Sequence, residues 1–196
     1  MSDNFRFDVI AAGFSGDSSV ALEALHHEDG TVRASALRAL ARIGTLTAEI
    51  LAPYIQDSHI ETRRTAVELA VPFPSVDVHQ CIDDLDVFVA EMAAWCVGER
   101  MPASDSEIET LIDRTTSHDE AVVREACAAA LGSLGDPRGL PAILAACSDK
   151  PAVRRRAILA LAPFEGEEVD AALHRALEDK DWQVRQNAED LLNPRS

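Results

Sequence analysis

A pattern that recurs roughly every thirty residues constrains the fold of this chain more than any other feature. Each copy combines a fixed position, usually arginine, with a small residue three positions later and apolar residues at helical spacing. The fixed position is held by Arg33, Arg63, Ala90, Arg124, Arg154 and Arg185, and the small residue by Ala36, Ala66, Ala93, Cys127, Ala157 and Ala188. One such unit cannot bury its apolar side alone, so the copies must stack on one another.

Each copy predicts a pair of helices. The first helix carries the fixed position and ends at glycine or proline, and Asp29, Asp86, Asp119 and Asp181 stand where its N-cap is expected. A second, more variable helix is expected at residues 47–56, 76–85, 105–115, 140–147 and 167–177. Residues 1–16 are expected to be irregular. Together these segments predict about eleven or twelve helices and no sheet.

The segment from Asp119 to Pro137 carries the pattern most completely, with Val123, Arg124, Leu131 and a Gly-Asp-Pro end. It resembles the HEAT repeats of the phycobilisome-lyase-like family, and the resemblance covers about residues 17–193. It implies an all-α fold, a right-handed α-solenoid of about five to six helical hairpins with terminal caps. The expected division is a single domain 1–196, with cap and unpaired helix 1–28, repeats 29–56, 57–85, 86–118, 119–148 and 149–180, and capping helix 181–196.

The formal net charge of −16 is unevenly distributed between the two kinds of helix. The first helices sum to +4, whereas the second helices with their flanking turns sum to −16. The resemblance implies that second helices line a concave surface, so we expect an acidic groove that attracts a basic segment of a protein partner. A solvated face that only maintains solubility is the alternative. The candidate residues are Asp77, Asp83, Asp84, Glu107, Glu109, Asp113, Glu167, Glu168 and Asp170.

The recurrent arginines allow two interpretations. They could form a basic stripe, or each could pair with an aspartate near the start of the adjacent repeat and so build a structural ladder. We favour the ladder, formed by Arg33, Arg63, Arg124, Arg154 and Arg185.

The third copy departs from the pattern, because Ala90 replaces the arginine and residues 87–97 are apolar on nearly every side. Such a helix is either buried or in contact with a partner. Phe88, Met92 and Trp95 are therefore candidate anchors for a partner protein or for a second copy of the chain.

Other classes of function have little support in the sequence. The acidity argues against nucleic acid and anionic lipid, and no apolar stretch is long enough to span a membrane. No catalytic, metal or cofactor motif occurs, and His26 to Asp29 is interpreted as a solvated turn. Four cysteines without a paired motif favour reduced, buried thiols in a cytoplasmic protein. A protein-binding scaffold is therefore expected. The resemblance also leaves open a bilin or tetrapyrrole lyase-like subunit, or an accessory domain of an enzyme complex.

Overall fold

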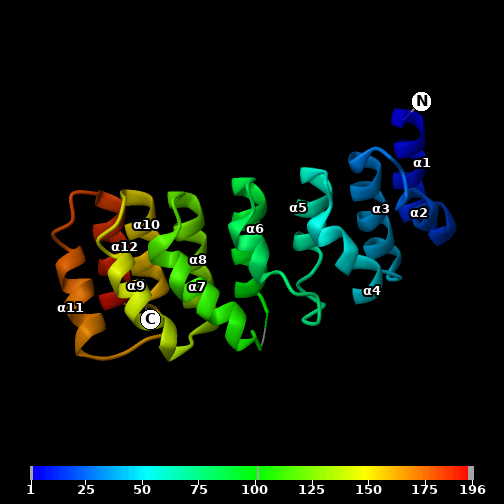
Figure 1. The fold of residues 1–196 in the computed structure, drawn as a ribbon. Coiled ribbons are helices and arrows are strands. Elements are labelled where there is room, and N and C mark those ends of the chain that lie inside the picture. Colours follow the sequence, from blue (N-terminus) through cyan, green and yellow to red (C-terminus); the bar gives the residue numbers. More distant parts are fainter. Residues whose placement is uncertain (1, 101, 194–196) are drawn as a thin grey trace. The chain divides into compact units, whose positions relative to one another are not determined.

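The computed structural model describes residues 2–100 and 102–193, and within these ranges it contains twelve α-helices, three 3-10 helices and no strand. The all-α prediction is therefore confirmed. The chain divides into two compact units, Met1–Cys96 and Val97–Ser196, and the division falls within α6. The units are described separately below (Figure 1).

Unit 1 begins with two helices that precede the first copy of the repeat. In chain order it contains α1 (Ser2–Ser15), α2 (Ser18–Ala24), α3 (Gly30–Ile43), α4 (Ala48–Leu51), the 3-10 helix η1 (Ala52–Gln56), α5 (Ile60–Glu68), the 3-10 helix η2 (His79–Asp83) and most of α6 (Val87–Gly98). The helices α1, α3 and α5 pack in this order as one row, and α2 and η1 pack against that row.

Unit 2 repeats the same two-row plan more regularly (Figure 1). In chain order it contains α7 (Asp105–Ser117), α8 (Ala121–Leu134), the 3-10 helix η3 (Pro137–Gly139), α9 (Leu140–Ala146), α10 (Pro151–Ala160), α11 (Glu167–Ala176) and α12 (Trp182–Leu192). The helices α8, α10 and α12 form one row, and α7 packs on both α8 and α9. The arginine-bearing helices α8, α10 and α12 are the first row of unit 2, and α1, α3 and α5 are the first row of unit 1.

Aspartate side chains cap two of the five arginine-bearing helices, α3 and α12, and also α6, at positions that the sequence predicts. Asp29 accepts a hydrogen bond from the backbone N–H of Thr31 at 2.8 Å, and Asp181 accepts one from that of Gln183 at 2.9 Å. Asp86 does the same for α6. The prediction for Asp119 is wrong, because α8 begins one residue later and its N-cap residue makes no side-chain capping bond.

Three expected elements differ from the sequence prediction. Residues 2–15 are helical rather than irregular, although this helix has no strong amphipathic pattern that would have indicated it. Residues 47–56 form a helix of one turn followed by a 3-10 helix that contains Pro53. Residues 76–85 hold only η2, after a stretch in which Pro72 and Pro74 lack the N–H groups that a helix needs.

The first rows pack closely because small residues face one another. A Cβ atom on Gly132 of α8 would lie 2.6 Å from the Cα of Ala160 on α10, so no larger residue fits there. In unit 1 a Cβ atom on Gly13 of α1 would lie 3.0 Å from the Cα of Ala39 on α3. Both positions let two helix backbones approach within contact distance, which fixes the side chains that emerge beside the contact.

No helix in the described part of the chain is long and apolar enough to cross a membrane.

Candidate functional site

Four of the repeated arginines each bind, through two hydrogen bonds, an aspartate in the turn before the next helix of the first kind. In each pair the Nε and Nη2 atoms of the arginine donate to the two carboxylate oxygens over distances of 2.5 to 2.9 Å. The pairs are Arg33–Asp57, Arg63–Asp84, Arg124–Asp149 and Arg154–Asp179. This fork geometry is specific to arginine. The prediction is wrong for Arg185, which donates to the backbone carbonyls of Asp179 and Lys180 and pairs with no carboxylate among the described residues.

The same arginines also bind the backbone of their own repeat. The Nη1 atom of Arg63 donates to the carbonyl of Asp57 at 2.9 Å, and that of Arg154 donates to the carbonyl of Asp149 at 2.8 Å. Each of these aspartates therefore accepts from one arginine through its side chain and from the next through its carbonyl. The aspartate also fixes its own turn, since Asp57 accepts from the N–H of His59 at 2.8 Å.

The paired aspartates are held in the ionised state. Arginine hydrogen bonds lower the pKa of Asp149 and of Asp179 below its usual value. At Asp57 and Asp84 burial acts in the opposite direction, but hydrogen bonds from arginine and from the backbone outweigh it, so their pKa values are also lowered.

The ladder consists of two runs, one in each unit, and each run starts at a histidine. Arg33 donates to the carbonyl of His27 and Arg124 to that of His118, both at 2.7 Å. These histidines occupy the position that holds aspartate elsewhere, and the Nδ1 of each accepts the N–H two residues later. No repeated arginine precedes either histidine. Ala90 occupies the fixed position in the copy before His118, and the first copy, with Arg33, begins only after His27. At both positions a histidine ring nitrogen therefore takes the place of the aspartate carboxylate as the acceptor within the turn.

Two acidic residues expected on a partner-binding surface are used inside the fold, and that expectation is wrong for both. Asp84 is the ladder partner of Arg63. Glu107 is buried, pairs with the fully buried Arg100, and forms a reciprocal capping box with Ser104 at the start of α7. Both carboxylates form hydrogen bonds and ion pairs within the fold, so neither is available to a partner.

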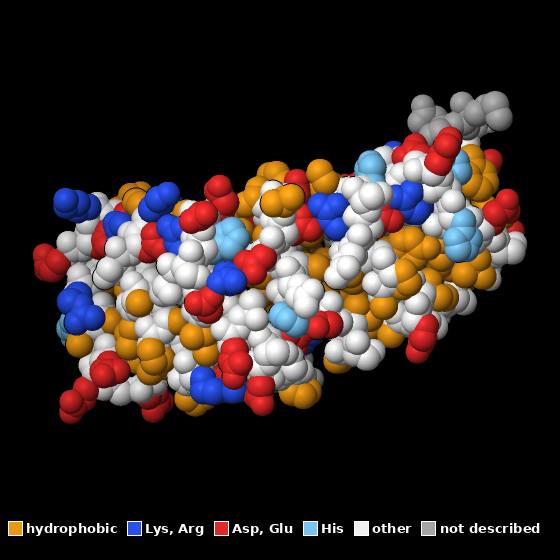
Figure 2. All heavy atoms as spheres, viewed as in Figure 1, with side chains coloured by type: hydrophobic (Ala, Val, Ile, Leu, Met, Phe, Trp, Pro, Cys, Tyr) orange, Lys and Arg blue, Asp and Glu red, His pale blue; other side chains and the backbone are white. Residues whose placement is uncertain are grey.

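The remaining acidic candidates lie in exposed positions. Asp77 contacts His79 and Asp113 contacts its neighbour Arg114, while Asp83 and Glu109 are exposed on η2 and α7. Glu167, Glu168 and Asp170 are exposed together in the first turn of α11. Figure 2 shows acidic side chains gathered at the lower left of the molecule, over the end of α11 at which the helix begins.

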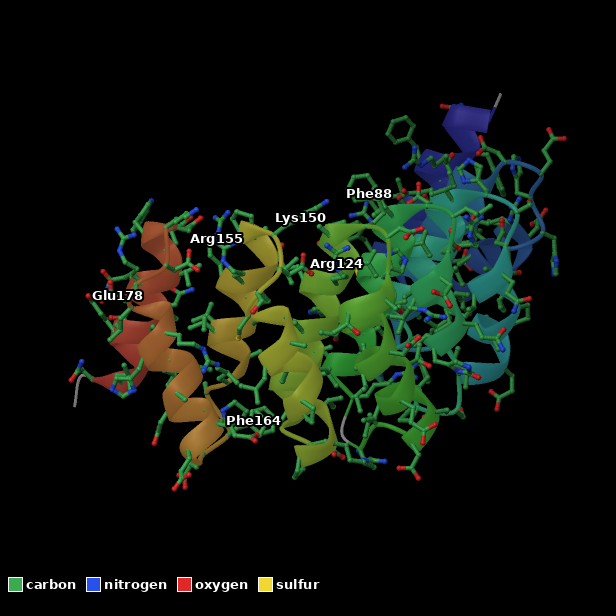
Figure 3. The ribbon with its side chains drawn as sticks, turned by 60° about the vertical axis from the view of Figure 1, so that its left-hand side comes forward. Phe88, Arg124, Lys150, Arg155, Phe164 and Glu178 are labelled. Atoms are coloured by element: carbon green, nitrogen blue, oxygen red, sulfur yellow. The ribbon has the colours of Figure 1, made fainter. Side chains whose placement is uncertain are left out.

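A hollow of about 470 Å³ lies beside this acidic turn. Seven of its ten lining residues are apolar, and Glu165, Gly166 and Asp170 complete the lining. Phe164, at the lower end of α11 in Figure 3, is half-buried and forms part of the wall. The apolar lining is Leu161, Ala162, Phe164, Val169, Leu173, Leu191 and Leu192. Sequence reasoning identified the acidic residues but not the hollow, because its walls come from three separate helices.

The aromatic candidates on α6 are not core residues. Phe88 is 57% exposed and Trp95 is 44% exposed, whereas Met92 is partly buried between them. The guanidinium carbon of Arg64 lies 5.9 Å from the ring centroid of Phe88, close enough for a cation–π contact. The interpretation of residues 87–97 as simply buried is therefore wrong on this side of the helix.

The described residues offer little for covalent or metal chemistry. No group of three histidine, cysteine, aspartate or glutamate side chains among them is arranged to hold a metal ion. Burial raises the pKa of Cys81 to about 12 and that of Cys147 to about 11, so both thiols stay protonated near neutral pH.

Comparison with known proteins agrees with the repeat pattern. Residues 77–162 match HEAT repeats, and residues 153–179 match the PBS lyase HEAT-like repeat. No curated protein is similar to the chain in sequence.

Several solved structures share the fold at low sequence identity. The Escherichia coli protein YibA is 16% identical, with a TM-score of 0.63 over 88% of this chain and 68% of its own. A designed armadillo repeat protein in complex with the peptide (KR)4 is 16% identical, with a TM-score of 0.62 over 88% of this chain and 96% of its own. Human deoxyhypusine hydroxylase is 21% identical, with a TM-score of 0.50 over 96% of this chain and 77% of its own. At these identities the likeness establishes the fold alone.

Proposed function

Because the chain carries HEAT repeats, we propose that it is a non-catalytic scaffold that binds another protein. Its contact surface is the acidic first turn of α11 together with the hollow beside Phe164. The partner presents a short segment that combines basic and apolar side chains. The basic side chains meet Glu167, Glu168 and Asp170, and an apolar side chain enters the hollow.

The observation that carries this proposal is that the exposed carboxylates of the first turn of α11 lie beside a hollow whose lining residues are mainly apolar. Exposed carboxylates alone explain only solubility, and an apolar hollow alone accepts many groups. Together they select a segment with both features, because the charges steer the encounter and the buried apolar side chain slows dissociation. The peptide (KR)4 held by one armadillo neighbour supports the general feasibility of basic-peptide binding on such a repeat fold.

Fluorescence anisotropy with two labelled peptides tests the proposal. We expect a peptide of alternating lysine and leucine to bind more tightly than (KR)4, and both to bind more weakly as salt is raised. The triple variant Glu167→Gln, Glu168→Gln, Asp170→Asn should weaken binding at least about tenfold. A matched triple variant at Glu23, Glu28 and Glu99 removes the same charge elsewhere and should have little effect.

The apolar half of the site has its own test. Phe164→Ser should weaken the lysine–leucine peptide and leave the affinity for (KR)4 almost unchanged. If the two triple variants lost the same peptide affinity, the acidic turn would act only through the overall charge of the protein. The proposed site would then be wrong.

A second contact surface is favoured by the exposure of Phe88 and Trp95 on α6. Here the partner is a second copy of the chain, and exposed aromatic rings are the residues that commonly anchor such contacts. Sedimentation equilibrium should show a mass that rises with concentration and returns to that of the monomer in Phe88→Ser with Trp95→Ser. A monomeric wild-type protein at high concentration would remove this candidate.

A lyase-like role makes a different prediction, namely that a linear tetrapyrrole binds and changes its visible absorbance. We expect no spectral change when a bilin is titrated with the purified protein. A saturable change with one binding site would favour the lyase-like subunit over the scaffold.

A further inference from the structure

A second hollow, in unit 1, carries the opposite charge. It has a volume of about 230 Å³ and lies between α1 and α3. Three arginines line it, namely Arg6 from α1 and Arg38 and Arg42 from α3, and no acidic side chain does so among the residues that the structure describes. Ser35 and Ala39 supply small side chains, and Ile10 and Phe14 supply apolar ones. We propose that this hollow, named the arginine hollow, binds a protein segment in which an acidic side chain is followed by an apolar one.

The packing of α1 on α3 brings these three arginines together. Gly13 lies against Ala39 so closely that a Cβ atom on the glycine would be 3.0 Å from the Cα of Ala39. This contact brings Arg6 beside two arginines that follow it by more than thirty residues in the chain. The sequence pattern gave no sign of the site, since Arg6 stands outside the repeats.

Two of the three arginines have no carboxylate partner. Within the described residues no aspartate or glutamate lies within ion-pair distance of Arg6 or Arg42. Arg38 does pair, with Glu61 at 3.2 Å and Glu68 at 3.6 Å, but these contacts are well exposed and therefore easily exchanged.

The unpaired arginines are already held in place by neutral groups. The Nε of Arg6 donates to the hydroxyl of Ser35 at 3.1 Å, and Ser35 in turn donates to the carbonyl of Thr31 at 2.8 Å. The guanidinium of Arg42 lies 4.0 Å from the centroid of the Phe14 ring. Both side chains keep their Nη atoms available for an anion, and little side-chain freedom remains to be lost on binding.

The walls of the hollow distinguish a protein segment from a free anion. Phe14 is 72% exposed and Ile10 is 39% exposed, so both present apolar surface beside the guanidinium groups. A carboxylate can accept two parallel hydrogen bonds from an arginine fork, and an adjacent apolar side chain can cover Ile10 and the open side of Phe14. Inorganic anions gain only the first of these contacts.

A second arginine-lined hollow, on the first row of unit 2, serves as an internal control. It lies on α8, α10 and α12 and has a volume of about 370 Å³, with Arg155 and Arg156 in its lining. Arg155 there donates to Gln183 at 2.6 Å and lies 3.5 Å from Asp181, and Arg156 lies 3.6 Å from Glu125. Because both arginines already have polar partners within unit 2, we expect this hollow to bind acidic peptides only weakly.

A peptide titration tests the arginine hollow independently of the proposed function, since it uses residues of unit 1 and a ligand of opposite charge. A fluorescein-labelled peptide of alternating glutamate and leucine should bind. A peptide of alternating glutamate and serine should bind at least about tenfold more weakly. The pair Arg6→Gln with Arg42→Gln should weaken binding at least about tenfold. The matched pair Arg155→Gln with Arg156→Gln should change it less than about twofold.

The folded state is verified in each variant by thermal unfolding, and Phe14→Ala adds a readout of the apolar contact. Phe14→Ala should reduce the preference for leucine over serine in the peptide. Equal effects of the two arginine pairs, or equal competition by inorganic phosphate and by the unlabelled peptide, would overturn the assignment of a protein segment to this hollow. Failure of these measurements leaves the acidic site on α11 untouched.

Discussion

Arg154 of α10 and Asp179 in the turn before α12 hold each other at two points, with Nε 2.8 Å from Oδ2 and Nη2 2.7 Å from Oδ1. Both side chains are largely buried, with 18% and 15% of their surfaces exposed. Arg154 also donates to the carbonyl of Asp149, which is itself the ladder partner of Arg124. Consecutive repeats of unit 2 are thus joined by a continuous series of charge-assisted hydrogen bonds.

Removing one member of this pair should destabilise unit 2. We expect Arg154→Ala to lower the free energy of unfolding by about 2 to 3 kcal/mol, below the full cost for a completely buried ion pair because some water reaches the site. Arg154→Lys should recover only part of this loss, since a lysine cannot bind both oxygens and the carbonyl with one planar group. Urea unfolding monitored by circular dichroism measures both values.

Arg156→Ala is the matched control, because Arg156 is on the same helix but its side chain is 46% exposed and its ion pair with Glu125 spans 3.6 Å. We expect a change within about 0.5 kcal/mol. Equal losses at positions 154 and 156 would contradict the ladder as a source of stability.

The ladder also predicts how stability depends on pH. Asp149 and Asp179 have pKa values below those of an unfolded chain, about 3.9, because arginine hydrogen bonds favour the ionised form. A lowered folded-state pKa gives stability that is present above the unfolded pKa and is lost as pH falls through the folded pKa. The free energy of unfolding should therefore fall steeply below about pH 4.

The double variant Asp149→Asn with Asp179→Asn checks this assignment. It should be less stable than the wild type at pH 7, and its stability should decline less between pH 5 and pH 3 as measured by urea unfolding at each pH. A decline as steep as that of the wild type would assign the acid sensitivity to other carboxylates.

The sequence predicted that the repeated arginines pair with aspartates, but it could not indicate which aspartate pairs with each arginine. Asp83 and Asp84 are adjacent and chemically identical, yet only Asp84 reaches Arg63. The partner also lies between 21 and 25 residues after its arginine, a spacing that changes with the length of the second helix. Charge counting therefore assigned a structural carboxylate to a binding surface.

Helix α1 and Glu107 show a second reason for such errors. The pattern of α1 has no amphipathic period: Phe7 and Phe14 are exposed, whereas Val9 and Ala12 are buried. Packing on α3 and α2 therefore stabilises it as a helix. Glu107 is buried in a pair with Arg100, which is itself buried and stands outside both α6 and α7. Neither effect is local, so periodicity could not indicate it.

Close helix packing gives a third prediction, at Gly132. An alanine there would place its Cβ 2.6 Å from the Cα and 2.7 Å from the Cβ of Ala160, and neither atom belongs to a flexible side chain. Helix propensity favours alanine over glycine by up to about 1 kcal/mol, but the overlap forces α8 and α10 apart. We expect Gly132→Ala to destabilise unit 2 by about 1 to 3 kcal/mol in urea unfolding. Ser133→Ala, exposed on the same helix, should be nearly neutral, and equal stability of the two variants would contradict the packing argument.

The buried pair of Arg100 and Glu107 gives the last prediction. Arg100 is fully buried, and its guanidinium contacts the Glu107 carboxylate, whose other oxygen accepts the N–H of Ser104 at 2.8 Å. Glu107→Gln keeps the size and the capping bond but removes the negative charge beside a buried cation, so the free energy of unfolding should fall by about 3 kcal/mol. Glu109→Gln, exposed on the same helix, should change it by less than about 0.5 kcal/mol.

Replacing both partners separates the charge from the packing. Arg100→Met with Glu107→Gln removes the buried cation as well, so this double variant should be more stable than Glu107→Gln alone. Chemical unfolding of the wild type, Glu107→Gln, Arg100→Met and the double variant completes a double-mutant cycle. A double variant that loses the sum of the two single losses would show that the two side chains act independently, and the pair would then contribute packing and capping rather than charge neutralisation.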